Sequence, residues 1–174
     1  RCFWLKVYEI PEGSKTSKGR AIQNIINLPK DDKVMAYINT KDLKDEEYIN
    51  SHYIMMCTKK GVVKKTSLEA YSRPRTNGIN AITIREGDQL LEAKMTTGNS
   101  HIMMAVKSGK AIHFEEEKVR SMGRTAAGVR GIRLANDNDE VVGMICFEDV
   151  NTSFLVVAEN GYGKRSAVED YRIT

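Results

Sequence analysis

The sequence contains little cysteine and no long apolar run. Its three cysteines, Cys2, Cys57 and Cys146, lie far apart and form no Cys-x-x-Cys pair. Their odd number and wide spacing predict neither a disulfide framework nor a zinc ribbon. No stretch approaches the roughly 20 apolar residues that cross a bilayer, and the first residues lack a secretory signal pattern. These absences favour a protein of the reducing cytoplasm.

The motifs of common catalytic and cofactor sites are also missing. Residues 161–166 (GYGKRS) superficially suggest a phosphate-binding loop, but that motif requires glycine at Ala158 and serine or threonine at Arg165. The acidic run at residues 137–140 lacks the glycine and distal glutamate of a calcium loop. The three histidines have no metal-ligand spacing. We therefore expect no catalytic residue, metal or cofactor in this chain.

An internal repeat is the most informative feature that is present. Residues 53–61 (YIMMCTKKG), 101–109 (HIMMAVKSG) and 153–161 (SFLVVAENG) each place an apolar run before a polar turn and a glycine. The three glycines are 48 and 52 residues apart, close to the ~40–50 residues of propeller blades. Residues 64–71 (KKTSLEAY) also match residues 164–171 (KRSAVEDY) without a gap. The chain is therefore built from related units.

Each unit continues into a second pair of predicted strands. Residues 81–84 correspond to residues 131–134, and to Ala21 and Ile22 in a less regular first copy. An alternating strand follows, with one apolar face in each of two units: Leu91, Ala93 and Met95, then Val142, Met144 and Cys146. Four short strands per unit predict an all-β fold, a propeller-like array of four-stranded antiparallel blades.

The repeats predict one partial domain over residues 1–174. Its units are expected at about 1–52, 53–100 and 101–152, with a half-unit at 153–174. Because both ends fall inside a blade and the first residue is not methionine, we expect a fragment of a larger ring. The one acidic, helix-compatible stretch, residues 41–47 (KDLKDEE), is interpreted as a solvated insertion in the first loop.

Positive charge is small overall but concentrated in the second unit. The whole chain carries a net charge of +4, and residues 53–100 alone hold eight lysines and arginines against four acids. Such an edge can be a solvated face that protects a sheet from aggregation. Because basic residues recur at one repeated position, however, they also predict a track for a phosphate backbone.

The candidate DNA-binding residues form two groups, one in or beside the hairpin turns and one in the loops between strand pairs. They are Lys59, Lys60, Lys64, Lys65, Arg73, Arg75, Arg120, Arg124, Arg130, Lys164 and Arg165. His113 occupies the repeated basic position in the third unit. Nearby Gly78 and Gly128 either let the backbone approach a phosphate or serve tight turns. Nothing suggests base readout, so we expect non-specific, salt-dependent binding.

These features resemble the C-terminal domain of the DNA gyrase A protein. The resemblance rests on residues 119–134 (VRSMGRTAAGVRGIRL), 161–166, 8–11 (YEIP) and 75–82 (RTNGINAI), and it covers essentially the whole chain. It implies a β-pinwheel, in which neighbouring blades exchange strands and DNA bends around a basic outer rim. The family's wrapping box, Gln-Arg-Arg-Gly-Gly-Lys-Gly, is absent, so we expect DNA binding without productive wrapping.

The resemblance also implies the larger context. It places the chain in a bacterial, cytoplasmic and chromosome-associated type II topoisomerase that introduces negative supercoils. The implied partners are duplex DNA, the rest of the gyrase A protein and the gyrase B protein, in an A2B2 heterotetramer without a membrane. ATP and magnesium belong to other domains of that enzyme.

Two alternatives stay open. The C-terminal domain of topoisomerase IV shares the fold and DNA binding but not strong wrapping. A propeller that acts as a protein-interaction platform, as in WD-repeat proteins, would need Gly-His and Trp-Asp signatures. These signatures are missing, and Trp4 is the only tryptophan.

Overall fold

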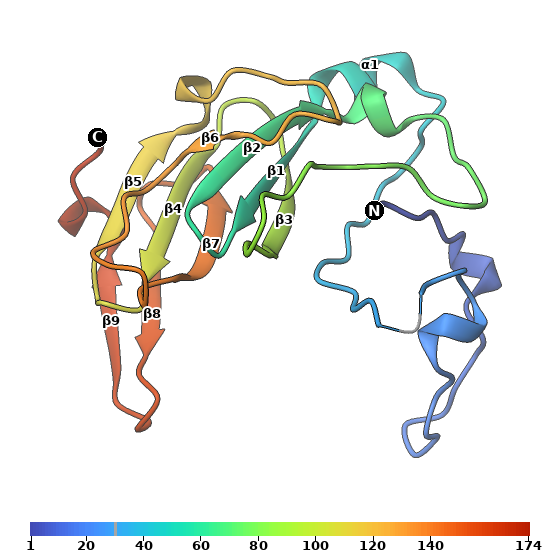
Figure 1. Cartoon of the computed structure of the whole chain (residues 1–174), viewed down its shortest axis with the longest axis horizontal. Coiled ribbons are helices and arrows are strands. Elements are labelled where there is room, and N and C mark those ends of the chain that lie inside the picture. Colours follow the sequence, from blue (N-terminus) through green and yellow to red (C-terminus); the bar gives the residue numbers. More distant parts are fainter. Residues whose placement is uncertain (30) are drawn as a thin grey trace.

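The computed structural model describes residues 1–29 and 31–174, and short strands dominate it (Figure 1). The strands are β1 (Tyr53–Thr58), β2 (Val62–Ser67), β3 (Leu90–Thr96), β4 (His101–Val106), β5 (Ala111–Glu115), β6 (Val129–Arg130), β7 (Val141–Phe147), β8 (Ser153–Val157) and β9 (Gly163–Ala167). The helical elements are α1 (Glu46–Ser51) and the 3-10 turns η1 (Val7–Glu9), η2 (Ile22–Asn24), η3 (Leu68–Tyr71), η4 (Glu116–Lys118) and η5 (Val168–Asp170). The all-β prediction is confirmed.

Neighbouring units exchange a strand. One sheet has the order β3-β1-β2-β6, the next has the order β5-β4-β7, and β8 pairs with β9. The strand β6 follows β5 in the sequence yet pairs with β2 of the preceding unit, through Val62 opposite Arg130 and Val63 opposite Val129. The first unit repeats this contact, because Cys2 bridges Ile79 in the same antiparallel sense. The expected exchange between blades is therefore present.

A second contact between units lies two residues further along the second strand of each hairpin, β2 and β5. Lys65 bridges Ser121, and His113 bridges Ile173, both in a parallel sense. The amides of Met122 and Thr174 close these contacts by donating 2.8 Å hydrogen bonds to the backbone oxygens of Lys65 and His113. Pro74 occupies the equivalent position at the junction of the first two units, and proline has no amide hydrogen to donate.

Several predicted strands are absent from the structure. Residues 81–84 and 131–134 form no ladder, and Ile22–Asn24 is the 3-10 turn η2. The amides of Gly131 and Ile132 both donate to the backbone oxygen of Gly61, at 2.8 and 3.2 Å. These two hydrogen bonds to one carbonyl hold the segment against the previous unit without extending a sheet. Local periodicity of the sequence does not reveal such a contact between units.

The acidic segment of the first loop also differs from its prediction. Instead of a wholly solvated insertion, its end starts the helix α1 at Glu46. The Asp45 carboxylate caps this helix by accepting a 3.2 Å hydrogen bond from the amide of Tyr48. The side chains of Tyr48 and Ile49 pack on a core cluster, and that packing holds the short helix in place.

The alternation of the outer strands is interrupted by a bulge. The pairing of β1 with β3 skips Leu91, and the pairing of β4 with β7 skips Val142 at the equivalent place. An extra residue reverses the side-chain alternation that follows. Leu91 therefore packs on a different cluster from Ala93 and Met95, and Val142 is exposed. The prediction that each trio shares one face is wrong at its first member.

The two ends of the strands differ in composition and connection. At one end lie the hairpin turns that join β1 to β2, β4 to β5 and β8 to β9. At the other end the second strand of each hairpin runs directly into a 3-10 turn, as β2 does into η3 and β5 into η4. We call the 3-10 turns with the loops that follow them (residues 72–80, 119–128 and 171–174) the rim, and the opposite end the hairpin end.

Candidate nucleic-acid interface

Two lysines expected on the DNA-binding surface lie inside the protein. Lys64 and Lys65 on β2 have 0 % and 7 % of their surface exposed. The Nζ atom of Lys64 donates 2.5 Å hydrogen bonds to the backbone oxygens of Ala81 and Arg124. Burial, with a smaller contribution from the Arg124 charge, lowers the pKa of Lys64 to about 8. This burial contradicts direct DNA contact by either lysine and corrects that prediction.

Lys65 pairs with a second buried charge. Its Nζ atom lies 3.1 Å from Oε1 of Glu116, and the two side chains are 8 % and 0 % exposed. The same Nζ atom lies 4.3 Å from the centroid of the Tyr53 ring. Lys65 belongs to the second unit and Glu116 begins η4 of the third. The ion pair therefore joins two neighbouring units.

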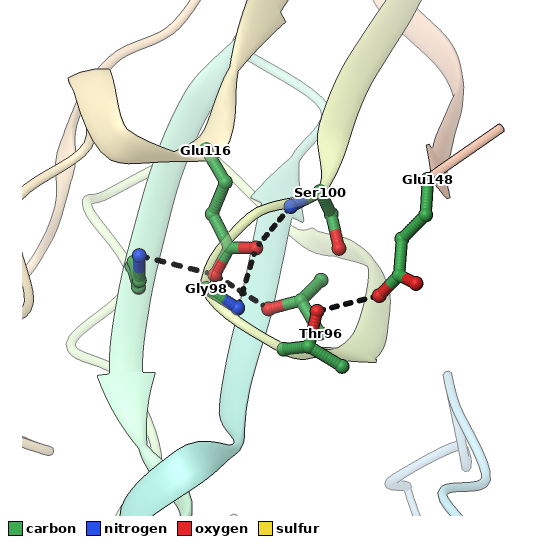
Figure 2. A network of polar contacts seen from close by, with 7 residues as sticks. Thr96, Gly98, Ser100, Glu116 and Glu148 are labelled. Carbon is green, nitrogen blue, oxygen red and sulfur yellow. Dashed lines mark hydrogen bonds and ion pairs between the residues drawn. The ribbon is translucent and has the colours of Figure 1, made fainter. Parts of the chain in front are cut away.

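Both oxygens of the Glu116 carboxylate have hydrogen-bond or ion-pair partners (Figure 2). Its Oε1 atom accepts a 2.7 Å hydrogen bond from the Thr96 hydroxyl. Its Oε2 atom accepts from the amides of Gly98 and Ser100, at 3.1 and 3.2 Å. Sequence reasoning missed Glu116, although an acid there is conspicuous because the equivalent positions of the other units are apolar: Val7, Leu68 and Val168.

The repeated basic position is a junction between units. Its four occupants are Trp4, Lys65, His113 and Arg165. Trp4 donates a 3.1 Å hydrogen bond from Nε1 to the backbone oxygen of Tyr71, and Nδ1 of His113 lies 3.0 Å from that of Tyr171. Both acceptors belong to the following unit and occupy equivalent positions. Three of the four occupants, Trp4, Lys65 and His113, therefore contact the next unit. These three residues do not form an exposed row of basic side chains.

The fourth occurrence is exposed. Lys164 and Arg165 lie on β9 with their side chains open to solvent. Nε of Arg165 donates a 2.6 Å hydrogen bond to the Ser153 hydroxyl on β8. These two residues stay candidate DNA contacts.

The loop arginines lie on the rim. Arg73, Arg75 and Arg120 are exposed, and Arg124 is half-buried. Two further exposed rim cations, Lys118 and Arg172, were missed by sequence reasoning. The repeat itself carries the signal for Arg172, because it stands one residue after Tyr171 as Arg120 stands after Val119.

The remaining candidates lie at the hairpin end. Lys59 is half-exposed and pairs with Glu140 at 3.2 Å, and Lys60 is exposed in the same turn. Arg130 is exposed on β6 opposite Val62, the first residue of β2. A six-residue strand such as β2 spans about 20 Å. The sequence-predicted cations that remain accessible in the second and third units therefore form two separate groups, one on the rim and one at the hairpin end.

The two loop glycines serve contacts between units. Gly78 and Gly128 have positive φ angles of 65° and 94°. A Cβ atom on them would lie 2.7 Å from the Cys2 oxygen and 2.5 Å from the Val63 oxygen. The close approach that requires glycine is thus to the backbone of the preceding unit, at the exchanged strand.

The core cysteines are poor nucleophiles. Burial raises the pKa of Cys57 and of Cys146 to about 12, so both thiols are protonated at neutral pH. Cys57 is fully buried, as its repeat position predicts. Within residues 1–29 and 31–174, no three metal-ligating side chains gather. No helix in this part of the chain has the length and apolar character needed to cross a bilayer.

The segments that match a known protein family correspond to the repeated units. The chain matches the family described as DNA gyrase C-terminal domain, beta-propeller, over residues 1–41, 52–96, 100–148 and 152–174. The chain belongs to this family. Over 98% of this chain, it is 42% identical to the gyrase A protein of Salmonella typhimurium and 44% identical to that of Helicobacter pylori. Over 100% of this chain, it is 42% identical to the gyrase A protein of Chlamydia pneumoniae. It spans only 19–20% of these relatives.

Solved structures of the family have the same architecture. The chain superposes on the C-terminal domain of DNA topoisomerase IV with a TM-score of 0.83 at 26% identity, covering 97% of this chain and 50% of that one. It superposes on a DNA gyrase A C-terminal domain with a TM-score of 0.76 at 25% identity, covering 96% and 51%. The β-pinwheel prediction is confirmed.

Proposed function

We propose that this chain binds duplex DNA without sequence preference along its rim, as part of the DNA-wrapping region of a gyrase A protein. The observation that carries the proposal is the recurrence of exposed cations at the rim in successive units: Arg73 and Arg75, then Lys118 and Arg120, then Arg172. Ion pairs in the described part of the chain engage Lys59, Lys65 and Lys94. The rim arginines thus keep their charge available for phosphates.

The whole enzyme supplies the rest of the proposed activity. As a gyrase A segment, the chain would work in the bacterial cytoplasm with the remainder of the gyrase A protein and with the gyrase B protein, in an A2B2 assembly. ATP and magnesium would be bound by other domains, and this chain would contribute the DNA-bending surface without a cofactor. Bending duplex DNA costs elastic energy, and phosphate contacts made along a curved surface offset it.

A second candidate is the equivalent domain of topoisomerase IV, which the higher TM-score favours. The 42–44% identity to gyrase A proteins favours the first proposal. The two candidates differ in whether the domain wraps DNA. Because the wrapping box is absent from these residues, the test uses the whole protein of which this chain would be a segment. Ligation of nicked circles bound by that protein separates the candidates, because wrapping traps supercoils of one sign and simple binding does not.

The test of DNA binding is a salt titration with matched charge variants. We expect the 174-residue chain to bind unrelated long duplexes equally and to lose affinity steeply as salt rises. The rim variant Arg73→Gln/Arg75→Gln/Arg120→Gln should weaken binding and reduce the slope of log affinity against log salt by about 3.

A control carries the same charge change at the hairpin end. Lys60→Gln/Lys107→Gln/Arg130→Gln also removes three exposed cations, but these lie away from the rim. It should change the salt slope by much less than the rim variant. Equal effects of the two variants, or no binding by the wild type at low salt, would contradict the proposal. Absent binding would favour a protein-interaction module.

A further inference from the structure

We infer that Lys65 and Glu116 are positioning residues for Arg120, so that the buried ion pair acts on DNA through this exposed arginine. The inference rests on the proposed function. It assigns a role to Lys65 that does not depend on contact between its ammonium group and a phosphate.

Lys65 holds both ends of the short segment that carries Arg120. Its side chain pairs with Glu116 at 3.1 Å, at the start of the segment. Its backbone oxygen accepts a 2.8 Å hydrogen bond from the amide of Met122, at the end. Arg120 lies between these two anchors and follows the buried Val119. The backbone around Arg120 is therefore fixed to β2 of the preceding unit.

Glu116 extends this clamp to the connection between units. Its carboxylate accepts from the hydroxyl of Thr96, the last residue of β3, and from the amides of Gly98 and Ser100 in the turn between β3 and β4. With the Lys65 ammonium group, four donors converge on two oxygens, so the carboxylate has one orientation that satisfies all of them. A glutamine amide nitrogen cannot accept a hydrogen bond. Glu116→Gln would therefore leave at least one donor without a partner.

Lys65 and Arg120 line the same open groove. The groove has a volume of about 480 Å³, and the exposed acid Glu117 lines it together with Lys65, Arg120, Tyr53 and Asn99. Among these five residues, Arg120 is the exposed cation. The Lys65 charge is neutralised by Glu116, so Arg120 is the groove residue that can attract a phosphate, from a backbone position that the two anchors fix.

Simple electrostatics and positioning predict opposite signs for one substitution. Glu116→Gln removes a negative charge close to the rim, and a general Coulomb effect would make DNA binding tighter. Loss of the clamp instead weakens binding. We expect the variant to bind duplex DNA about threefold to tenfold more weakly at moderate salt. Glu115→Gln is the matched control, because Glu115 is exposed, adjacent to Glu116 and outside the groove. It should bind as tightly as the wild type or slightly tighter.

A double-mutant cycle distinguishes positioning from general loss of structure. Arg120→Gln should reduce the salt slope by about 1. Adding Glu116→Gln to that variant should change affinity little, because the arginine it positions is gone. A merely structural role of Glu116 would weaken binding equally with and without Arg120. That result, or tighter binding by Glu116→Gln alone, would overturn the inference.

A charge-neutral variant guards against a folding defect. Lys65→Met/Glu116→Gln removes both charges, and the glutamine oxygen can still accept from the amides of Gly98 and Ser100 while its nitrogen donates to the Thr96 hydroxyl. It should fold, and Arg120→Gln should weaken DNA binding less in this variant than in the wild type. An equal effect of Arg120→Gln in both proteins would overturn the inference. Failure of the wild type to bind DNA would instead reject the proposed function itself.

Discussion

Lys64 is a lysine whose environment is set by two units at once. The second unit supplies the oxygen of Ala81 and the third supplies that of Arg124. A neutral amine still has two hydrogens for these acceptors, so loss of the proton keeps both contacts. Burial lowers the pKa to about 8, and the native state therefore releases this proton more easily than the unfolded chain.

The sign of the resulting pH dependence follows from proton binding. Between about pH 8 and the ordinary lysine pKa of about 10.4, the unfolded state binds more protons, so the free energy of unfolding rises with pH. We expect the stability difference between the wild type and Lys64→Met to grow in favour of the wild type from about pH 7 to about pH 10. Urea denaturation of both proteins at each pH measures it, and an unchanged difference would contradict the assignment.

At the scale of elements, strand exchange requires glycine at the point where the loop approaches the preceding unit most closely. The loop that enters β6 passes so close to β2 that a Cβ on Gly128 would lie 2.5 Å from the Val63 oxygen. Gly109, in the turn between β4 and β5, has a similar φ of 87° but nothing within 4 Å of its Cβ position. A comparison of the two positions therefore distinguishes the cost of backbone strain from the cost of a disturbed contact between units.

Alanine substitutions at these glycines should differ in cost. Gly109→Ala should lower the free energy of unfolding by about 1–2 kcal/mol, because a non-glycine residue is strained at positive φ. Gly128→Ala should cost about 1–3 kcal/mol more, because the added methyl also displaces the exchanged strand. Urea denaturation compares the two variants, and equal losses would show that β6 tolerates the displacement.

The elements also show what local sequence patterns can and cannot predict. The apolar runs of β1, β4 and β8 are evident in the sequence because they repeat in register. The same repetition predicts a strand at residues 131–134, but both leading amides contact Gly61 of another unit. The burial of Lys64 and Lys65 has a similar origin, since groups of the following unit help to enclose them. Repetition identifies equivalent positions, while contacts between units decide what each position does.

At the scale of the whole molecule, the units differ in how completely they are covered. Met55 and Met56 on β1 are 0 % and 4 % exposed, whereas their equivalents Leu155 and Val156 on β8 are 70 % and 55 % exposed. Both hairpins have the same antiparallel register. Two differences accompany this contrast. Among the described strands β3 pairs with β1 while β8 pairs with β9 alone, and Met55 and Met56 pack in core clusters that include no residue of β8.

Amide hydrogen exchange should reveal this gradient. Backbone amides of β8 and β9 should exchange much faster than the equivalent amides of β1 and β2 in the 174-residue chain, because few apolar contacts oppose their local opening. Native-state exchange followed by mass spectrometry gives both rates in one experiment. Equal protection of the two hairpins would mean that backbone pairing alone stabilises them.

The ion pair between Lys65 and Glu116 also bears on how related units find their correct neighbours while the chain folds. The units are similar enough that one could dock against the wrong copy, a known hazard of repeat proteins. If the second unit met the fourth, Lys65 would face Val168 and would be buried without an opposite charge, which is strongly unfavourable. A single charged junction thus distinguishes the right neighbour from the wrong one and keeps the order of the array the same as the order of the sequence.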